Sequence, residues 1–366
     1  MADKKPSSTA CQCLSKKTMF FGLILCVLFY LLVVPLSVYA RSSSFFTFPV
    51  YSENNSLIET FGMRDFMVNF LGNGNTTPVN NVISALQSAS KPGSRKDLCD
   101  GCFKHDFKYL LNSEKICKTG NDSKVIDLLL VVTTIHKNFK SRHILRNSWL
   151  SASKNNTANI RYVFLFGKTN DTELQKKLVA EASVYNDIVQ EDFIDAYRNL
   201  TYKTIMGLKW ATKFCMQARY VMKTDDDMWI NVPVLLNSLD AQYKPLDIVY
   251  GACWSGAPHR HTHSKWYVPE HLYPHKKYPM FCSGTGYVMK NETAEKIWKA
   301  SEDIPFFYLE DVYVGLCLRY IGGQAINTKG FYNNKASNPC TYRGKTIITS
   351  HYLRMDFITG IWNSKC

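Results

Sequence analysis

The sequence predicts an α/β protein with a mainly parallel, doubly wound sheet. Two apolar runs rich in β-branched and aromatic residues, 125–134 and 160–167, read as strands that are buried on both faces. A third apolar run, 220–224, ends in three consecutive aspartates. Segments with helical periodicity separate these runs, and strands that alternate with helices favour parallel pairing with helices on both faces.

The first half of the predicted domain supplies two strand and helix pairs. After the strand at 125–134, Ile144, Leu145 and Trp149 can lie on one face of a helix. The strand at 160–167 is followed by the helix-like segment TELQKKLVAEASVY. Both pairs have the order that a parallel sheet requires.

The second half continues the same order. We expect a helix over 201–218, because Thr204, Leu208, Ala211 and neighbouring small residues recur three and four positions apart. This helix leads into the strand with the aspartates. DIVYGACW and CSGTGYVMK are further predicted strands, and the glycines of the second allow the backbone to approach a ligand closely.

Asp225, Asp226 and Asp227 follow the strand at 220–224 directly. In open α/β sheets the ligand crevice lies at the carboxyl ends of the strands. Alternate residues of an extended segment point to the same side, so Asp225 and Asp227 can both face a divalent cation that prefers oxygen ligands. The structural alternative is a solvated acidic turn.

A second acidic pair, Glu310 and Asp311, begins a predicted helix whose apolar residues Val312, Leu316 and Leu318 face a core. The helix dipole favours acids in the first turn, which is a sufficient structural explanation. The functional alternative is that one of the two is a general base, because aromatic and apolar neighbours raise a carboxyl pKa toward the working pH.

Residues 18–40 contain no charged residue and are long enough to span a bilayer as a helix. Four lysines precede this span and only Arg41 follows closely, so we expect 1–17 to be a cytoplasmic tail and the rest of the chain to lie in a lumen or outside. The Ser, Asn, Thr and Gly content of 41–119 indicates a stem, and 120–366 is the predicted catalytic domain.

The composition, with 46% hydrophobic and 20% charged residues, allows a sizeable core, and the formal net charge is +14. We exclude nucleic acid as a partner, because the basic residues are dispersed, no RNA-binding motif occurs, and the expected topology separates the domain from nucleic acid. The charge suits a small anionic substrate.

Nine cysteines follow the predicted span, and an odd number in an oxidising compartment leaves one unpaired. We interpret Cys99 and Cys102 as a structural bridge. Seven N-x-S/T sequons occur, and among them Asn199 and Asn291 are predicted glycosylation sites.

From about residue 128 to 354 the chain resembles the β-1,3-galactosyltransferases and β-1,3-N-acetylglucosaminyltransferases, which are type II Golgi enzymes with the GT-A nucleotide-sugar fold. Seven blocks carry the resemblance, in the order of that family: RHILRNSW, FLFG, VYNDIVQEDFIDAYRNLTYKT, KTDDD, VYGACW, YPMFCSGTGYVM and EDVYVGLCL. Thr285 departs from the pattern, because the family usually has glycine there.

The resemblance implies that Asp225 to Asp227 form the DxD motif. Asp227 would then ligate Mn²⁺, and Asp225 or Asp226 would hold the ribose or the waters of the metal. Asp311 matches the catalytic base of the family. His351 lies where family members have a late histidine able to complete the coordination of the metal, the alternative being an ordinary surface or core histidine.

Arg142 and Arg146 match family arginines near the nucleotide, and guanidinium groups suit phosphate, although arginines on a helix are often only solvated. Asp195 and Lys203 are further candidates for donor binding. Asn199 has helix capping as its alternative role.

The implied activity is Mn²⁺-dependent, inverting β-1,3-transfer of a hexose or N-acetylhexosamine, with galactose favoured, from a UDP-sugar to an acceptor glycan on protein or lipid. We expect a single-pass type II protein of the Golgi membrane. A catalytically inactive chaperone or glycan-binding module on the same fold is the main alternative, and a metal-dependent phosphohydrolase is another.

Overall fold

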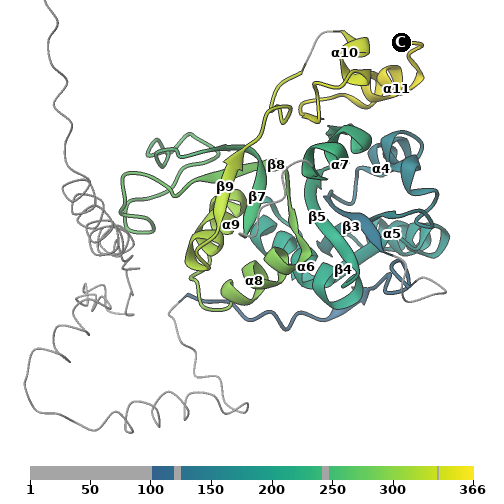
Figure 1. Cartoon of the computed structure of the whole chain (residues 1–366). Helices are drawn as coiled ribbons and strands as arrows, with labels where there is room; N and C mark the ends of the chain where they lie inside the picture. The colour runs from purple at the N-terminus through teal and green to yellow at the C-terminus, as the bar shows by residue number, and fades with distance from the viewer. Residues whose placement is uncertain (1–100, 119–124, 241–246, 336–337) are drawn as a thin grey trace, which may run out of the picture. The chain divides into compact units, whose positions relative to one another are not determined.

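A sheet of eight strands forms the centre of the computed structural model, which describes residues 101–118, 125–240, 247–335 and 338–366. The strand order is β1-β4-β3-β2-β5-β8-β7-β9 (Figure 1). These strands are β1 (Tyr109–Leu111), β2 (Ile126–Thr133), β3 (Ile160–Lys168), β4 (Ile188–Ile194), β5 (Ala218–Asp225), β7 (Ile248–Trp254), β8 (Phe281–Lys290) and β9 (Gln324–Asn327).

The sheet is mainly parallel, as the sequence predicts. Strands β2, β3, β4 and β5 are parallel neighbours, and β7 and β9 run in the same direction. Only β8, which is antiparallel to β5 and β7, and the edge strand β1 run the other way. The carboxyl ends of six strands therefore meet at one edge of the sheet.

Helices cover both faces of this sheet. They are α4 (Phe139–Arg146), α5 (Thr172–Tyr185), α6 (Leu200–Phe214), α7 (Val232–Asp240), α8 (Asn291–Ala300), α9 (Glu310–Tyr320), α10 (Pro339–Arg343) and α11 (Met355–Asn363), with short 3-10 helices η1 (Trp149–Ser153) and η2 (Tyr197–Asn199). The predicted helix 201–218 is α6, which ends earlier than expected because Cys215 forms a disulfide and Ala218 already begins β5.

Alternating side chains of the central strands enter two different cores. Leu128, Leu130 and Val132 of β2 belong to the cluster that includes Leu145 and Trp149 after the first strand. Val131, which lies between them in sequence, faces α6, where a Cβ at Gly207 would lie 3.4 Å from the Val131 side chain. Burial on both faces explains why these strands are continuous apolar runs.

The C-terminal segment returns to the sheet through a small two-stranded ladder. Strand β10 (Thr349–Ser350) pairs antiparallel with β6 (Trp229–Ile230), which follows the three aspartates. Helices α10 and α11 pack on one another, and α11 also contacts α4 (Figure 1). This ladder brings the residues after 350 to the end of β5.

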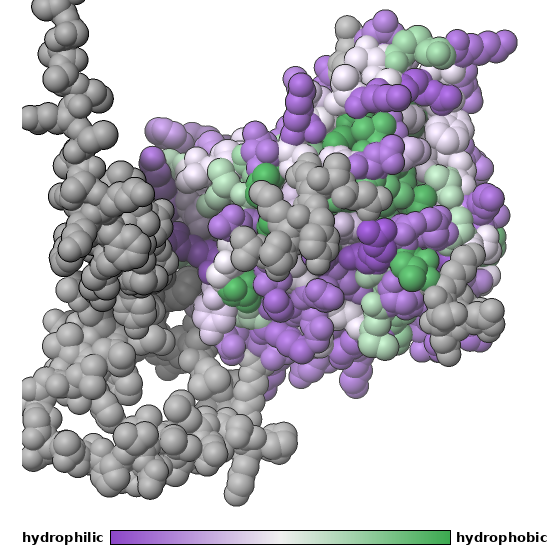
Figure 2. Space-filling view, in the orientation of Figure 1, coloured by the Kyte–Doolittle hydropathy of each residue, from purple (hydrophilic) through white to green (hydrophobic). Residues whose placement is uncertain are grey.

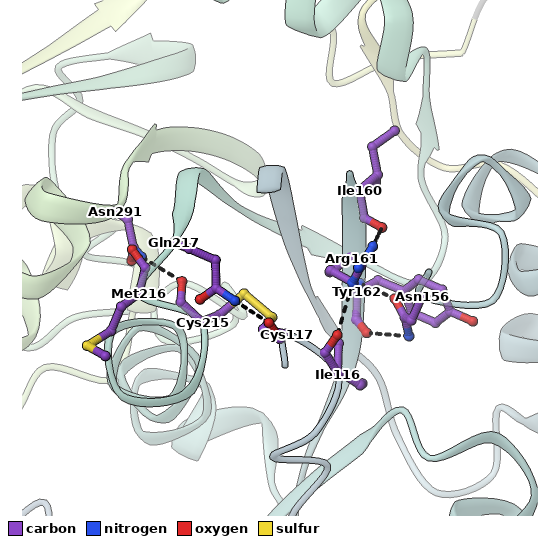
Figure 3. The surroundings of a disulfide bond; sticks show 10 residues. All are labelled: Ile116, Cys117, Asn156, Ile160, Arg161, Tyr162, Cys215, Met216, Gln217 and Asn291. Atoms are coloured by element: carbon purple, nitrogen blue, oxygen red, sulfur yellow. Dashed lines mark hydrogen bonds between the residues drawn. A yellow bond between two sulfur atoms is a disulfide. The ribbon is translucent and has the colours of Figure 1, made fainter. Parts of the chain in front are cut away.

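Three disulfides fasten segments that are distant in sequence. Cys117–Cys215 joins the chain before β2 to the end of α6 (Figure 3). Cys253–Cys282 joins β7 to β8, and Cys340–Cys366 closes the C-terminal segment. Cys102 is also disulfide-bonded, but Cys99, its predicted partner, lies outside the described residues. Among the described cysteines the unpaired one is Cys317, which is buried.

The side chain of Asn291, a predicted glycosylation site, is engaged in hydrogen bonds inside the fold. Its side chain is buried, and its amide nitrogen donates hydrogen bonds to the carbonyl oxygens of Cys215 (3.0 Å) and Met216 (3.4 Å) beside the disulfide (Figure 3). Thr293 of the same sequon is buried too. A glycan would be attached at the nitrogen that makes these contacts, so it would replace them, and glycosylation of Asn291 stays a prediction.

The surface of the described domain is mainly hydrophilic on the face that Figure 2 shows, and the hydrophobic side chains there form small separate patches. No helix in the described part of the chain is long and apolar enough to cross a membrane. The predicted tail, membrane span and most of the stem, residues 1–100, lie outside that part.

Candidate active site

The acidic turn lies at the carboxyl end of β5, next to the end of β2. Asp225 pairs in register with Thr133, the last residue of β2. Its carboxylate accepts hydrogen bonds from the Thr133 hydroxyl and from the Lys223 ammonium group, the latter at 2.7 Å. Asp225 is therefore held from two strands while remaining partly exposed.

Asp226 points toward the loop after β2. Its Oδ2 accepts hydrogen bonds from Thr134 Oγ1 (2.5 Å) and Asn138 Nδ2 (2.8 Å). Burial raises the pKa of this carboxyl, against the opposing effect of the two hydrogen bonds. The middle aspartate thus has different neighbours from the two that flank it.

Asp225, Asp227 and His351 form the potential metal site in the described residues. One ligand atom of each lies within 4.8 Å of the others, and His351 Nε2 is 3.2 Å from Asp227 Oδ2. Two carboxylates and an imidazole are a donor set that fits Mn²⁺, and all three side chains keep some exposure for further ligands. The residues predicted as ligands are thus brought together.

Backbone contacts hold His351 in this position. Ser350 pairs with Trp229 in the β6 and β10 ladder, and the Leu353 amide donates a hydrogen bond to the Asp227 carbonyl (3.2 Å). Between them, Tyr352 has a left-handed backbone with φ of 59°. That conformation is unfavourable for a bulky residue, and it persists where the surrounding contacts determine it.

Glu310, at the start of α9, lies on the same cleft and is almost fully buried. Its Oε1 is 3.3 Å from the Lys223 ammonium and accepts a hydrogen bond from the Tyr287 hydroxyl (3.4 Å). Burial raises the pKa of Glu310 to about 7, although the positive charge of Lys223 opposes this. Gly284 packs on this carboxylate, because a Cβ there would lie 3.2 Å from Oε2.

Asp311 also lines the cleft and has the character of a base. Its Oδ1 accepts a hydrogen bond from the Val312 amide at 2.8 Å. Burial raises its pKa above the usual aspartate range, while this amide and the charge of Lys223 lower it. The carboxyl therefore has a raised pKa, and it lines the same cleft as Asp225, Asp227 and His351.

These residues share one cleft of about 670 Å³, open at one side. Its lining includes the carboxylates of Asp225, Asp227, Glu310 and Asp311 together with His351. It also includes an aromatic wall, which consists of Tyr197, Trp254, Trp266, Tyr278, Phe281, Tyr308 and Tyr352. A cleft of this size that combines charged and aromatic side chains can hold a substrate of more than one ring.

The two predicted phosphate-binding arginines lie elsewhere. Arg142 is fully buried, and its guanidinium contacts Glu181 (2.6 Å) and the carbonyl oxygen of Ile135 (2.9 Å). Arg146 is paired with Glu181 and Asp187, both at 2.8 Å. Neither lines the cleft. Both arginines fasten α4 to α5 through Glu181, and Arg146 also joins α4 to the residue before β4. Because their donors are occupied, direct contact with a ligand does not fit this geometry.

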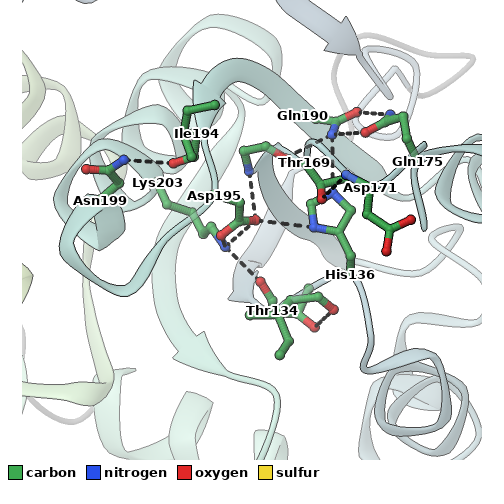
Figure 4. A network of polar contacts seen from close by, with 12 residues as sticks. Thr134, His136, Thr169, Asp171, Gln175, Gln190, Ile194, Asp195, Asn199 and Lys203 are labelled. Carbon is green, nitrogen blue, oxygen red and sulfur yellow. Dashed lines mark hydrogen bonds and ion pairs between the residues drawn. The ribbon is translucent and has the colours of Figure 1, made fainter. Parts of the chain in front are cut away.

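Asp195 and Lys203 form a buried polar cluster next to Thr134, at the start of the loop after β2 (Figure 4). Lys203 Nζ donates hydrogen bonds to Asp195 Oδ1 (2.7 Å) and to the Thr134 carbonyl (2.7 Å). His136 lies 3.8 Å from Asp195, and burial lowers its pKa. This cluster fixes the backbone at Thr134, whose hydroxyl holds Asp226, so the two residues support the acidic turn from behind.

Asn199 is the residue before α6, but its side chain does not cap that helix. Its Nδ2 donates a hydrogen bond to the Ile194 carbonyl at 2.8 Å (Figure 4), and it is half-buried. Thr201 of the sequon is fully buried, with its hydroxyl on the Phe307 carbonyl. Glycosylation of Asn199 stays a prediction, and the capping alternative is not what the side chain does.

Thr285 shows how the departure from the family pattern is accommodated. It has no left-handed backbone, so a residue larger than glycine fits without strain. Its hydroxyl donates a hydrogen bond to Asn333 Oδ1 (2.9 Å) and lies 3.0 Å from Ser283 Oγ. All three residues line the cleft, which adds a polar strip to its floor.

Sequence reasoning missed Lys223 and the aromatic wall. A lysine two positions before Asp225 in a buried strand is itself a signal, because lysine is rarely buried unless paired. Trp254, the last residue of β7, and Trp266, in the loop that follows, have no such signal, since aromatic residues at these places are equally consistent with packing.

Three kinds of relative are found by comparison with known proteins. Residues 140–329 match the family model described as Galactosyltransferase. Human β-1,3-galactosyltransferase 1 is 39% identical over 262 residues, which cover 71% of this chain and 78% of that protein. Human β-1,3-galactosyltransferase 2 is 37% identical over 269 residues, covering 71% of this chain and 62% of that protein.

Among solved structures, a mannosyltransferase from Pyrobaculum calidifontis in complex with GDP-Man and Mn²⁺ is similar at 12% identity and a TM-score of 0.34, over 72% of this chain and 64% of that one. A likeness this weak supports no inference about the site. The family model and the sequence relatives carry the assignment, and the chain belongs to the β-1,3-galactosyltransferase family and is a hexosyltransferase.

Proposed function

We propose that this protein is a Mn²⁺-dependent, inverting β-1,3-glycosyltransferase with a GT-A fold. It transfers galactose, or another hexose or N-acetylhexosamine, from a UDP-sugar to the 3-hydroxyl of an acceptor glycan on protein or lipid. The observation that carries the proposal is the presence of two acidic groups in one cleft: Asp225 and Asp227 with His351, and the carboxylate of Asp311.

The two groups suit the two halves of the reaction. A metal bound by Asp225, Asp227 and His351 would neutralise the negative charge that develops on the departing diphosphate. Asp311 takes the proton of the acceptor 3-hydroxyl while that oxygen attacks the anomeric carbon. The new C–O bond forms as the bond to UDP breaks on the opposite face, so an α-linked donor gives a β-linked product and one base suffices.

Other residues act by holding these groups in place. Asp226, bonded to Thr134 and Asn138, lies toward the loop after β2, where the ribose of the donor would be bound. Asp195 and Lys203 fix that loop from below, and Arg142 does so from the side through the Ile135 carbonyl. Residues that hold the reacting groups in the correct orientation increase the rate of transfer.

We further propose that the protein is a single-pass type II protein of the Golgi membrane, with the catalytic domain in the lumen. The uncharged segment 18–40 and the lysines that precede it support this topology. The cysteine pairing of the described domain fits an oxidising compartment.

An inactive chaperone or glycan-binding module is the competing function. Such a protein has no need for a base and a metal group in one cleft, whereas both are retained here. A phosphohydrolase is distinguished by its product, because it would release the phosphate or sugar to water and leave the acceptor unchanged.

The test is a transfer assay on the full-length protein in detergent. The purified protein is incubated with UDP-galactose, Mn²⁺ and a panel of glycan acceptors, and the acceptor products and free galactose are measured separately. We expect a β-1,3-linked product that requires Mn²⁺. Donor hydrolysis with no acceptor product would indicate a hydrolase, and acceptor binding with neither product would indicate the binding module.

A further inference from the structure

We propose that the wall of the cleft beside Asp311 is an acceptor subsite, in which the Trp266 ring, flanked by Lys265 and His259, binds a sugar unit that carries an anionic substituent. This inference rests on the proposed function and specifies its acceptor. The substituent is a carboxylate or a sulfate at a position other than the reacting 3-hydroxyl.

The position of this wall follows from the position of the base. A general base must lie within hydrogen-bond reach of the hydroxyl that it deprotonates, so the acceptor lies against Asp311. Asp311, Tyr197 and Trp266 line the same cleft. Trp266 is therefore a side chain that an acceptor bound at Asp311 can contact.

The aromatic side chains of this wall are exposed toward the cleft. Trp254 is 41%, Trp266 42% and Tyr197 52% exposed. Large aromatic side chains that stay accessible inside a cleft lined by few other apolar groups offer flat faces for a ligand. One face of a pyranose ring presents several C–H groups, which pack on an aromatic ring. The wall thus has the chemistry of a sugar-binding surface.

The loop that carries Trp266, between β7 and β8, is fixed by its own hydrogen bonds. The Arg260 guanidinium donates to the carbonyl oxygens of Val268 (2.8 Å) and Tyr273 (2.6 Å). The Val268 amide donates to the His259 carbonyl (2.8 Å). These contacts place Trp266 before a ligand arrives, so little ordering has to accompany binding.

Basic side chains lie beside Trp266, whereas the metal group is acidic. Lys265 Nζ lies 4.6 Å from the centre of the Trp266 ring, and the His259 ring centre lies 5.4 Å from it. No ion pair to a carboxylate is formed by Lys265 or His259 among the described residues. A cation that contacts an aromatic face and has no acidic partner of its own is available to a ligand anion.

The rest of the loop between β7 and β8 also carries a positive formal charge. Between residues 255 and 280 there are four lysine or arginine residues and one acid, Glu270, which gives a formal charge of +3, and five histidines. In the proposed function the diphosphate of the donor is bound at the metal group of Asp225, Asp227 and His351, and not by this loop. An acidic group on the acceptor is the complement that this loop fits.

The test uses the full-length enzyme with UDP-galactose and Mn²⁺ and two acceptors that differ only in charge: benzyl β-N-acetylglucosaminide and its 6-O-sulfate. The KM of each acceptor is measured with wild type, Trp266→Ala, Trp266→Phe and Lys265→Glu. Lys276→Glu, an exposed lysine of the same loop that does not line the cleft, is the matched control. Calorimetric UDP affinity and melting temperature are measured for every variant.

We expect a lower KM for the sulfated acceptor in wild type, by about fivefold, as for one partly exposed ion pair. Trp266→Ala raises the KM of both acceptors at least tenfold, because stacking on the ring is lost. In Trp266→Phe the acceptor KM returns most of the way to the wild-type value. Lys265→Glu removes or reverses the preference for sulfate, whereas Lys276→Glu leaves it unchanged. UDP affinity stays within twofold throughout.

Equal KM values for the two acceptors in wild type would overturn the proposal. So would an unchanged acceptor KM in Trp266→Ala, or a weaker UDP affinity in Lys265→Glu, which would assign that lysine to the donor. If no transfer occurs, saturation-transfer NMR of the same acceptors with UDP and Mn²⁺ tests the subsite separately. Acceptor binding that is abolished in Trp266→Ala would support the subsite even though the transferase proposal has failed. The absence of acceptor binding in wild type would overturn the subsite.

Discussion

The backbone amide of Leu353 donates a hydrogen bond of 3.2 Å to the carbonyl oxygen of Asp227. This contact joins the C-terminal segment to the acidic turn after β5. Together with the β6 and β10 ladder it brings His351 to Asp227, with 3.2 Å between Nε2 and Oδ2. The candidate metal site is thus assembled from two segments that are far apart in sequence, and the C-terminal segment is an integral part of it.

Replacement of Asp227 by alanine is expected to abolish metal-dependent donor binding. The remaining Asp225 and His351 leave too few protein ligands for a divalent cation, so the dissociation constant of Mn²⁺ rises at least 100-fold. Titration of Mn²⁺ followed by electron paramagnetic resonance measures this directly. Asp356→Ala, which removes a surface carboxylate outside the cleft, is the control and should not change the affinity. Unaltered Mn²⁺ binding in Asp227→Ala would remove it from the ligand set.

Substitutions at Tyr352 test the strained turn that presents His351. Left-handed backbone costs L-residues about 1–2 kcal/mol, costs glycine almost nothing, and is least favourable for β-branched residues. Tyr352→Gly should therefore keep the Mn²⁺ dissociation constant within about threefold of wild type, whereas Tyr352→Val should raise it about tenfold or more. Tyr320→Val, at an exposed tyrosine outside the cleft, controls for loss of the ring. A higher Mn²⁺ dissociation constant in Tyr352→Gly than in Tyr352→Val would contradict this role for the turn.

Asp311→Asn should eliminate transfer while UDP affinity stays within about twofold, because the base acts on the acceptor and not on the nucleotide. In wild type the base must be ionised to accept a proton. Burial raises the pKa of Asp311, so activity is fully present above that pKa and is lost as the pH falls through it. A plot of log kcat/KM should fall with unit slope on the acid side, beginning above the usual aspartate range. A profile that stays flat down to pH 4 would exclude Asp311 as the base.

Two glycine substitutions separate packing at the acidic pair from general stability. A Cβ at Gly284 would lie 3.2 Å from Glu310 Oε2, so Gly284→Ala displaces that carboxylate and with it Lys223. We expect kcat to fall at least tenfold with a change in melting temperature of only a few degrees. Gly360 has open space around it within α11, so Gly360→Ala should leave kcat unchanged and stabilise the helix by about 0.5–1 kcal/mol. Equal kcat values in the two variants would contradict the packing argument.

Much of the fold is predictable from the sequence because the central strands are buried on both faces. The apolar runs at 125–134 and 160–167 are strands β2 and β3, and the acids at 225–227 follow a strand as expected. Asp225 and Asp227 do share a site, which the alternation of an extended chain indicates. Glu310 and Asp311 begin a helix, as predicted.

The rest depends on contacts between distant segments. The burial of Asn291 beside Cys215 cannot be inferred from its sequon, and the carboxylates that engage Arg142 and Arg146 come from α5 and the chain before β4. The role of Lys223 depends on contacts with Gly284 of β8 and Glu310 of α9, which the fold brings next to it. In each case the partner lies many residues away, where local pattern carries no information.

The central claim is that the cleft holds a divalent cation on which binding of the nucleotide depends. Isothermal titration of UDP into the full-length protein, with Mn²⁺ and again after chelation by EDTA, tests this most directly. We expect micromolar binding with Mn²⁺ that weakens at least 100-fold after chelation and is restored when Mn²⁺ is added back. UDP binding of equal strength in the presence and absence of the metal would contradict it.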